Sequence, residues 1–333
     1  MGVRSEFEVG RLHVAFFVCS PGGSATAWLS QTLNLYDERV FCSHGLTYLD
    51  QSRRERGATS ERDLFESMIA LESATRGVHG NVHGLYDCKK SYKYLSEAGC
   101  RISVLIRSPE DRAISKLRMT WRALHNNKGV LGFRGLFPAR WIPALVVLKQ
   151  MYVHYGVFDA FCATIDRVVD NLKKLMVQDD ELVSNMALKI SINDLLLVER
   201  WEETNILHFT YALHLFTDIG HDKASLSMLD LGRFFRMEDV TADFGGFHRI
   251  LTFLLGDFAD DEKIERLFHK SKSISANRRS EEHARGDVLR QMHIADDFVK
   301  DMTIHFVNIH NMATFYSTMG YYDKIVLDGN YRG

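Results

Sequence analysis

The stretch "FFVCSPGGSATAWL", Phe16 to Leu29, joins an apolar run, a glycine turn and a helix-forming run without a break. The apolar run begins at Leu12 and ends at Cys19, which is typical of a strand buried on both faces of a parallel sheet. The segment Thr26–Leu35 then predicts a helix. A strand, a tight turn and a helix in this order indicate an α/β fold with a ligand-binding loop.

The turn has the layout of an anion cradle. Glycines expose backbone N–H groups, and a helix N-terminus adds roughly half a positive charge, so a phosphate can bind without a side-chain cation. Ser24 and Thr26 add hydroxyl donors. No GK[ST] is present, so the loop is not a Walker A sequence. An ordinary strand–helix turn is the alternative.

The rest of the chain repeats the alternation of strands and helices. We expect one domain with a central parallel sheet, helices on both of its faces and helix-rich insertions. Further strands are predicted at Asn81–Tyr86, Arg101–Ile106 and Gly232–Met237. Helices are predicted at Lys90–Ala98, from Ser108 onward, through a helical insertion at about 124–215, at Phe244–Leu255 and at about 288–319.

Composition narrows the class of protein. The 333 residues are 46% hydrophobic and 25% charged, and the net charge of −2 with a pI of about 6.7 disfavours a nucleic-acid binder. Five cysteines without a CxxC pair argue against a disulfide framework or a zinc site and fit a reducing compartment. The N-terminus lacks the order of a signal peptide, and apolar runs such as Trp141–Leu148 are too short to span a bilayer. We expect a cytoplasmic protein.

A second stretch, "RISVLIRSPEDRAIS", places Arg107 where a strand ends and Ser115 two turns into the next helix. Ligands bind at strand ends in open α/β sheets, and an arginine fork beside a hydroxyl suits a terminal phosphate. The alternative is that Arg107 caps the sheet and Ser115 packs. A third stretch, Arg233–Leu255, combines a strand, an acidic turn and an amphipathic helix. For its Glu238 and Asp239 we favour a structural role.

In this order the three stretches resemble the sulfotransferases that use 3′-phosphoadenosine 5′-phosphosulfate (PAPS). The family's 3′-phosphate block R-x-P-x-D-x-x-x-S is matched position by position by Arg107–Ser115, and its R-x-E-D-[LV] block is matched by Arg236–Val240. The likeness covers roughly residues 10 to 290 and implies a P-loop-like sulfotransferase fold. It also implies that Arg107 and Ser115 bind the 3′-phosphate. The 5′-phosphosulfate would be bound by Pro21, Gly22, Gly23, Ser24, Ala25, Thr26, Ala27 and Trp28.

The chain departs from the family at the loop. Most members carry Lys or Arg just after the loop proline, where Gly22 and Gly23 stand here. Either another cation takes that role or the enzyme is slow. Lys89 and Lys90 are the candidates, of which we expect Lys90, although lysines at a helix start are commonly solvated.

The acceptor hydroxyl must lose a proton, and the resemblance implies a histidine on the strand before the 3′-phosphate block. His83 is the predicted base. His79, His44 and Asp87 are its rivals. A histidine packed at the end of a sheet is the structural alternative.

The late loop "SISANRRSEEHARGD" offers Arg278, Arg279 and Arg285 as further ligands of the 3′-phosphate, of which Arg279 and Arg285 are expected to bind; a solvated loop explains them equally well. The predicted function is sulfuryl transfer from PAPS to a hydroxyl or amine of a small metabolite or sugar, without a metal. Nucleic acid and membranes are not expected as partners, and homodimer formation is left open. The alternatives are an inactive sulfotransferase-like binding protein and a P-loop nucleotide kinase.

Overall fold

The chain divides into two compact units. The first comprises Met1–Arg107 and Ala224–Arg278, and the second Ser108–Lys223 and Arg279–Gly333. The sequence predicts a single domain, and this division into two units does not test that prediction. No helix in the described part of the chain is both long enough and apolar enough to cross a membrane. The computed structural model describes residues 15–21, 25–85, 88–125, 138–154, 160–176, 203–274, 289–290 and 294–322.

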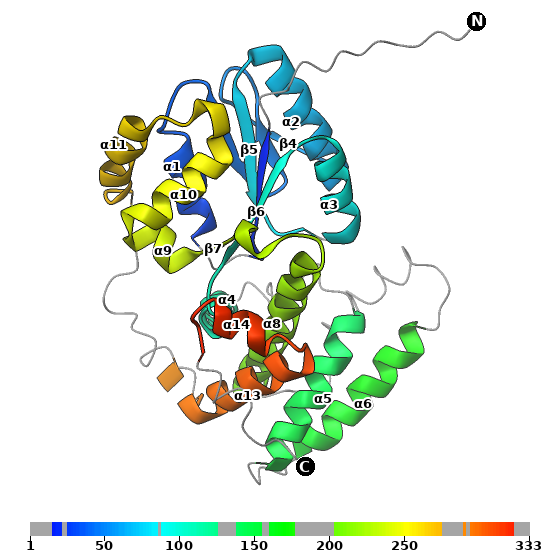
Figure 1. Ribbon diagram of the computed structural model, residues 1–333. Coiled ribbons are helices and arrows are strands. Elements are labelled where there is room, and N and C mark those ends of the chain that lie inside the picture. The colour runs from blue at the N-terminus through cyan, green and yellow to red at the C-terminus, as the bar shows by residue number, and fades with distance from the viewer. Residues whose placement is uncertain are drawn as a thin grey trace, which may run out of the picture. The chain divides into compact units, whose positions relative to one another are not determined.

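The first unit is built on a five-stranded parallel sheet (Figure 1), which confirms the predicted α/β class. The spatial order is β2-β5-β1-β6-β7, so the chain runs from the central β1 out to the edge and later crosses β1 to reach β6. The strands are β1 (Phe16–Cys19), β2 (Val40–His44), β5 (Val78–His83), β6 (Arg101–Ile106) and β7 (Phe234–Arg236).

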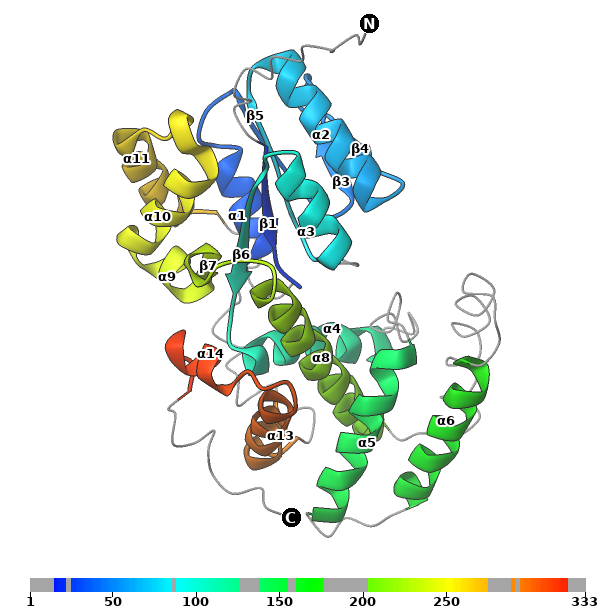
Figure 2. The ribbon, with the colours of Figure 1, turned by 45° about the vertical axis from the view of Figure 1, so that its right-hand side comes forward.

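Helices cover both faces of this sheet, as the sequence predicts (Figure 2). The four residues of β1 are fully buried, because Phe16 and Val18 face one helical layer while Phe17 packs edge-on against Phe65 of the other, with ring centroids 5.4 Å apart. On one face lie α2 (Glu61–Thr75) and α3 (Cys88–Glu97). On the other lie α1 (Thr26–Leu33), α9 (Met237–Ala242), α10 (Phe244–Leu255) and α11 (Asp261–Ser271).

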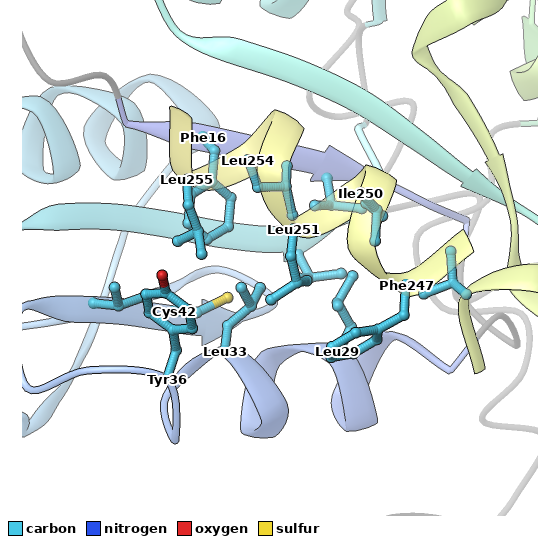
Figure 3. Close-up of a cluster of buried hydrophobic side chains, with 14 of the residues drawn as sticks. Phe16, Leu29, Leu33, Tyr36, Cys42, Phe247, Ile250, Leu251, Leu254 and Leu255 are labelled. Atoms are coloured by element: carbon cyan, nitrogen blue, oxygen red, sulfur yellow. The ribbon is translucent and has the colours of Figure 1, made fainter. Parts of the chain in front are cut away.

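The core between the sheet, α1 and α10 holds α1 in place (Figure 3). Leu29 and Leu33 of α1 are fully buried against Leu251 and Leu254 of α10. Burial of one such side chain contributes about 1.5–3 kcal/mol. Trp28 joins this core, and its Nε1 donates to the backbone oxygen of Ser271 over 3.2 Å. The start of α1 is therefore fixed at the carboxyl edge of the sheet.

A two-stranded antiparallel hairpin, β3 (Thr47–Leu49) and β4 (Glu55–Gly57), follows β2. The buried Asn81 of β5 secures it, because its Nδ2 lies within hydrogen-bond distance of the backbone oxygens of Gly45 (2.9 Å) and Thr47 (2.8 Å). Asn81 thus fixes the turn between β2 and the hairpin. Short 3-10 helices, Leu231–Arg233 and Gly256–Phe258, flank β7 and α10.

The described part of the second unit is helical, in keeping with the predicted insertion. Arg112 and Asp222 are both fully buried and form a two-pronged ion pair between α4 and α8, to which Tyr316 adds a hydrogen bond of 2.6 Å. The helices are α4 (Pro109–His125), α5 (Pro138–His154), α6 (Ala160–Met176), α8 (Glu203–Leu226, whose last three residues belong to the first unit), α13 (Asp296–Ile309) and α14 (Ala313–Thr318).

Candidate functional site

The carboxyl edge of the five-stranded sheet is the candidate site. In open parallel sheets ligands bind outside this edge, where neighbouring strands send their connections in opposite directions. Here the chain runs from β1 to β2 at one end of the strand order, and from the neighbouring β6 it continues to β7 at the opposite end. Ser20 and Pro21 follow β1 at this edge, and Arg107 follows β6.

The ends of β1 and β5 are joined through their backbones. The amide of Ser20 donates to the carbonyl oxygen of His83 over 3.2 Å. Gly84 allows this close approach, because a Cβ there would lie 2.9 Å from the oxygen of Ser20 and 3.2 Å from the Cα of Pro21. The predicted base is therefore held directly beside the start of the predicted phosphosulfate loop.

The loop itself has two unusual features at its described ends. Ser20 is 1% exposed, and its Oγ has no hydrogen-bond partner within the described ranges. Ala25 has a φ of 54°, in the left-handed region that few non-glycine residues adopt. Strained backbone of this kind concentrates at binding and active sites. Of the predicted loop ligands, Gly22, Gly23 and Ser24 lie outside the described residues.

Thr26 begins α1 and is paired with a histidine of β2. The Oγ1 of the buried Thr26 lies 3.0 Å from Nε2 of His44. Partial burial lowers the pKa of His44, and the carboxylate of Glu55 opposes that shift. One of the predicted rivals of His83 is thus brought to the N-terminus of α1.

His83 is a neutral imidazole at pH 7. Burial is the first cause that lowers its pKa to about 4, and the nearby His44 is the second. A neutral imidazole can accept the proton of an acceptor hydroxyl. A pKa this low also makes it a weak base near pH 7, so a bound anion that raises the pKa would improve it.

Arg107 is half-buried at the end of β6. Its Nε lies 4.0 Å from Oε1 of Glu238, in the first turn of α9. Arg236 and Asp239 form a second pair at 3.8 Å. The block that the sequence analysis assigns a structural role therefore lies against the predicted phosphate ligand.

The other predicted residues are spread more widely. Ala27 is half-buried, and the side chain of Trp28 belongs to the core. Lys89 and Lys90 are exposed on α3. Ser115 is half-buried in α4 of the second unit.

His79 lies near the amino end of β5 and not at the carboxyl edge of the sheet. It is buried, stacks on Phe41 with ring centroids 4.4 Å apart and hydrogen-bonds Thr75 Oγ1 at 2.9 Å. These contacts indicate a structural histidine. Asp87, Arg278, Arg279 and Arg285 lie outside the described residues.

Ser20 lies within the predicted loop but was not named among its ligands, and the contact made by Asn81 was not predicted. Ser20 stands directly before the loop proline, which could have marked it, whereas nothing local marks Asn81 as the residue that fixes the turn after His44. Across the described ranges, no group of three or more His, Cys, Asp or Glu side chains could hold a metal ion.

The chain was compared with protein-family models, curated proteins and solved structures. No protein-family model, no curated protein and no solved structure matches this chain.

Proposed function

We propose that the chain is a sulfotransferase that moves a sulfuryl group from PAPS to a hydroxyl or amine of a small metabolite or sugar. The observation that carries the proposal is the hydrogen bond from the Ser20 amide to the His83 carbonyl, which seats a candidate base beside a candidate anion loop. The resemblance of the three sequence blocks supplies the reaction class. In sulfuryl transfer, as in phosphoryl transfer, catalysis is largely positioning and charge neutralisation.

Each group has a proposed task. The loop from Ser20 to Thr26 holds the 5′-phosphosulfate with backbone amides, hydroxyls and the N-terminus of α1. Arg107 binds the 3′-phosphate, for which Ser115, Arg279 and Arg285 stay predictions. His83 accepts the proton of the acceptor. A bond forms between the acceptor oxygen or nitrogen and sulfur while the bond from sulfur to the 5′-phosphate oxygen breaks, and adenosine 3′,5′-bisphosphate leaves with that electron pair.

Donor binding is tested by calorimetric titration of adenosine 3′,5′-bisphosphate into wild type and variants. Arg107→Ala should weaken binding roughly 10- to 150-fold, because a hydrogen bond to a charged group contributes about 1.5–3 kcal/mol. Glu238→Gln should retain or strengthen binding, because the carboxylate competes with the phosphate for Arg107. Arg62→Ala is the matched control, since Arg62 is an exposed arginine paired with Glu66 on α2. Absence of wild-type binding at millimolar nucleotide would overturn the proposal.

Turnover is tested with PAPS and a broad panel of hydroxyl and amine acceptors, by following release of adenosine 3′,5′-bisphosphate. His83→Ala should bind the nucleotide as wild type does and lose turnover. Full activity of this variant would place the base elsewhere. His248→Gln is the control, because His248 is a half-buried histidine on α10 paired with Asp261 at 2.8 Å.

Two observations favour a second function, a binding protein of the same fold. The low pKa of His83, about 4, and the absence of a lysine or arginine from residues 20–28 would both slow the chemistry. Tight binding of PAPS without turnover on any acceptor would select this function. ATP consumption in place of PAPS turnover would instead identify a nucleotide kinase.

A further inference from the structure

Thr26 has one hydroxyl hydrogen, and the protonation state of His44 determines the direction in which this hydrogen is donated. The Oγ1 of Thr26 and the Nε2 of His44 are 3.0 Å apart. If Nε2 is unprotonated, it accepts the only hydrogen of Thr26, which then cannot donate to a ligand. If Nε2 carries a proton, it donates to Oγ1, and the hydroxyl hydrogen can point toward an anion at the start of α1.

An anion at this position needs more positive charge than the helix supplies. A helix N-terminus offers about half an elementary charge, and a phosphosulfate carries more than one negative charge. No lysine or arginine occurs between residues 20 and 28. The imidazole of His44 contacts the first residue of α1 and can take up a proton.

We propose that His44 is the positive charge of the anion site: it takes up a proton when the donor binds, and it orients the Thr26 hydroxyl toward the bound anion. This inference rests on the proposed function and adds a pH-dependent regulation of that same site. His44 acts through Thr26 and is therefore a positioning residue, whereas His83 stays the proposed base.

Charged groups around His44 favour this division of tasks. Burial lowers the pKa of His44, but the carboxylate of Glu55 on the hairpin opposes that shift, and the positive charge of one imidazole disfavours protonation of the other, His83. The more buried His83 has its pKa lowered to about 4. When environments separate two titratable groups in this way, one serves as the base and the other as the cation.

A second, independent feature indicates that a ligand binds here. Ser20, the first residue of the same loop, buries a hydroxyl whose Oγ has no hydrogen-bond partner within the described ranges. A buried polar atom without a partner costs free energy, and a bound anion would satisfy it. The loop thus presents an unsatisfied Ser20 hydroxyl at one end and the Thr26–His44 pair at the other.

The direction of the pH effect follows from linkage. An anion close to an imidazole raises its pKa by about one unit or more. Affinity is therefore highest below the pKa of His44 in the empty protein, and it falls about tenfold or more as the pH rises from that value to the higher pKa of the complex. Because phosphates also titrate near pH 6, the dependence on His44 is the difference between wild type and variant.

The experiment measures adenosine 3′,5′-bisphosphate and pyrophosphate binding from pH 5.5 to 8.5, together with an NMR titration of the His44 imidazole with and without each ligand. His44→Gln keeps a donor for Thr26 but no charge, so it should bind about tenfold more weakly than wild type at low pH and equally at high pH. His44→Lys should keep the affinity and lose the pH dependence. His248→Gln on α10 should behave as wild type does.

The outcomes separate the two proposals. A ligand-induced rise in the pKa of His44 with a flattened profile in His44→Gln supports the inference. An unchanged pKa of His44 with both ligands, or a His44→Gln profile identical to that of wild type, overturns it even if the nucleotide binds. Absence of nucleotide binding while pyrophosphate still raises the pKa of His44 overturns the sulfotransferase proposal and keeps the anion site.

Discussion

Glu72 is a buried carboxyl group on α2, 4% exposed, whose Oε1 has no hydrogen-bond partner in the described part of the chain. Burial raises its pKa to about 8, although a backbone hydrogen bond at Ala15 and the charge of Arg101 act in the opposite direction. The folded protein therefore holds a proton that the unfolded chain releases above its ordinary pKa of 4.5.

This proton predicts the pH dependence of stability. The contribution of protonated Glu72 is complete below pH 4.5 and is lost as the pH rises toward 8, because the folded state binds more protons than the unfolded state over that range. Glu72→Gln should flatten the decline and be more stable than wild type at pH 8, by up to a few kcal/mol. Urea unfolding at pH 5, 6.5 and 8 measures it. Glu97→Gln, an exposed carboxyl paired with Lys93, should retain the wild-type slope.

At the scale of elements, the packing of β5 against β1 depends on a missing side chain. Gly84→Ala would press a methyl group against the backbone of Ser20 and Pro21, which cannot rotate away. We expect nucleotide affinity to fall about tenfold or more, because displacement of the loop misplaces its N–H groups, at a stability cost of about 1–3 kcal/mol. Gly57→Ala in β4 has open space around its new methyl group and should leave the affinity unchanged. Titration calorimetry distinguishes the two variants, and equal affinities would contradict the proposed role of the loop.

The pair of α4 and α8 depends on a buried ion pair. Asp222→Asn should destabilise the second unit by about 3–5 kcal/mol, because it leaves Arg112 buried without its counter-charge. The double variant Arg112→Met/Asp222→Leu should recover most of that loss. Asp166→Asn, in an exposed pair with Lys149, should cost less than about 1 kcal/mol. Denaturant unfolding measures all three, and an unstable double variant would show that packing and not charge dominates.

Elements with strong local patterns could be predicted from the sequence. The structure gives Arg101–Ile106 and Phe244–Leu255 the predicted bounds, since each has a clear apolar period and a clear stop. The strand predicted at Asn81–Tyr86 begins instead at Val78 and ends at His83. Val40–His44 was not predicted as a strand, because its apolar run is short and no glycine or proline precedes it closely.

Individual residues of the candidate site could be predicted from the sequence, but the contacts between them could not. A glycine turn and a strand end mark Pro21 and Arg107 in the local sequence, whereas His83 was predicted through the family resemblance. The contact of His44 with Thr26 joins residues 18 positions apart through the order of the sheet, which no local pattern encodes. Trp28 was assigned to the loop through the family resemblance, and the structure adds that its side chain packs in the core.

On the scale of the whole molecule, every described residue of the proposed donor site except Ser115 belongs to the first unit. Adenosine 3′,5′-bisphosphate should therefore slow amide hydrogen exchange at the start of α1 and at the ends of β1, β5 and β6, because ligand binding suppresses local opening. Exchange in α6 should stay as it is in the ligand-free protein. Mass spectrometry of peptic fragments measures both. Protection confined to α5 and α6 would contradict the assignment of the site.

The strand order also means that two paired strands, β6 and β7, are synthesised at different times. β6 leaves the ribosome early, but its partner β7 follows roughly 130 residues later, after the segment 108–223. At about 5–20 residues per second, the edge of β6 waits roughly 6–26 s for its neighbour. During that interval a strand whose residues from Ile102 to Ile106 are buried in the folded protein presents unpaired backbone groups. A nascent chain of this protein is thus most exposed to aggregation before β7 has been made.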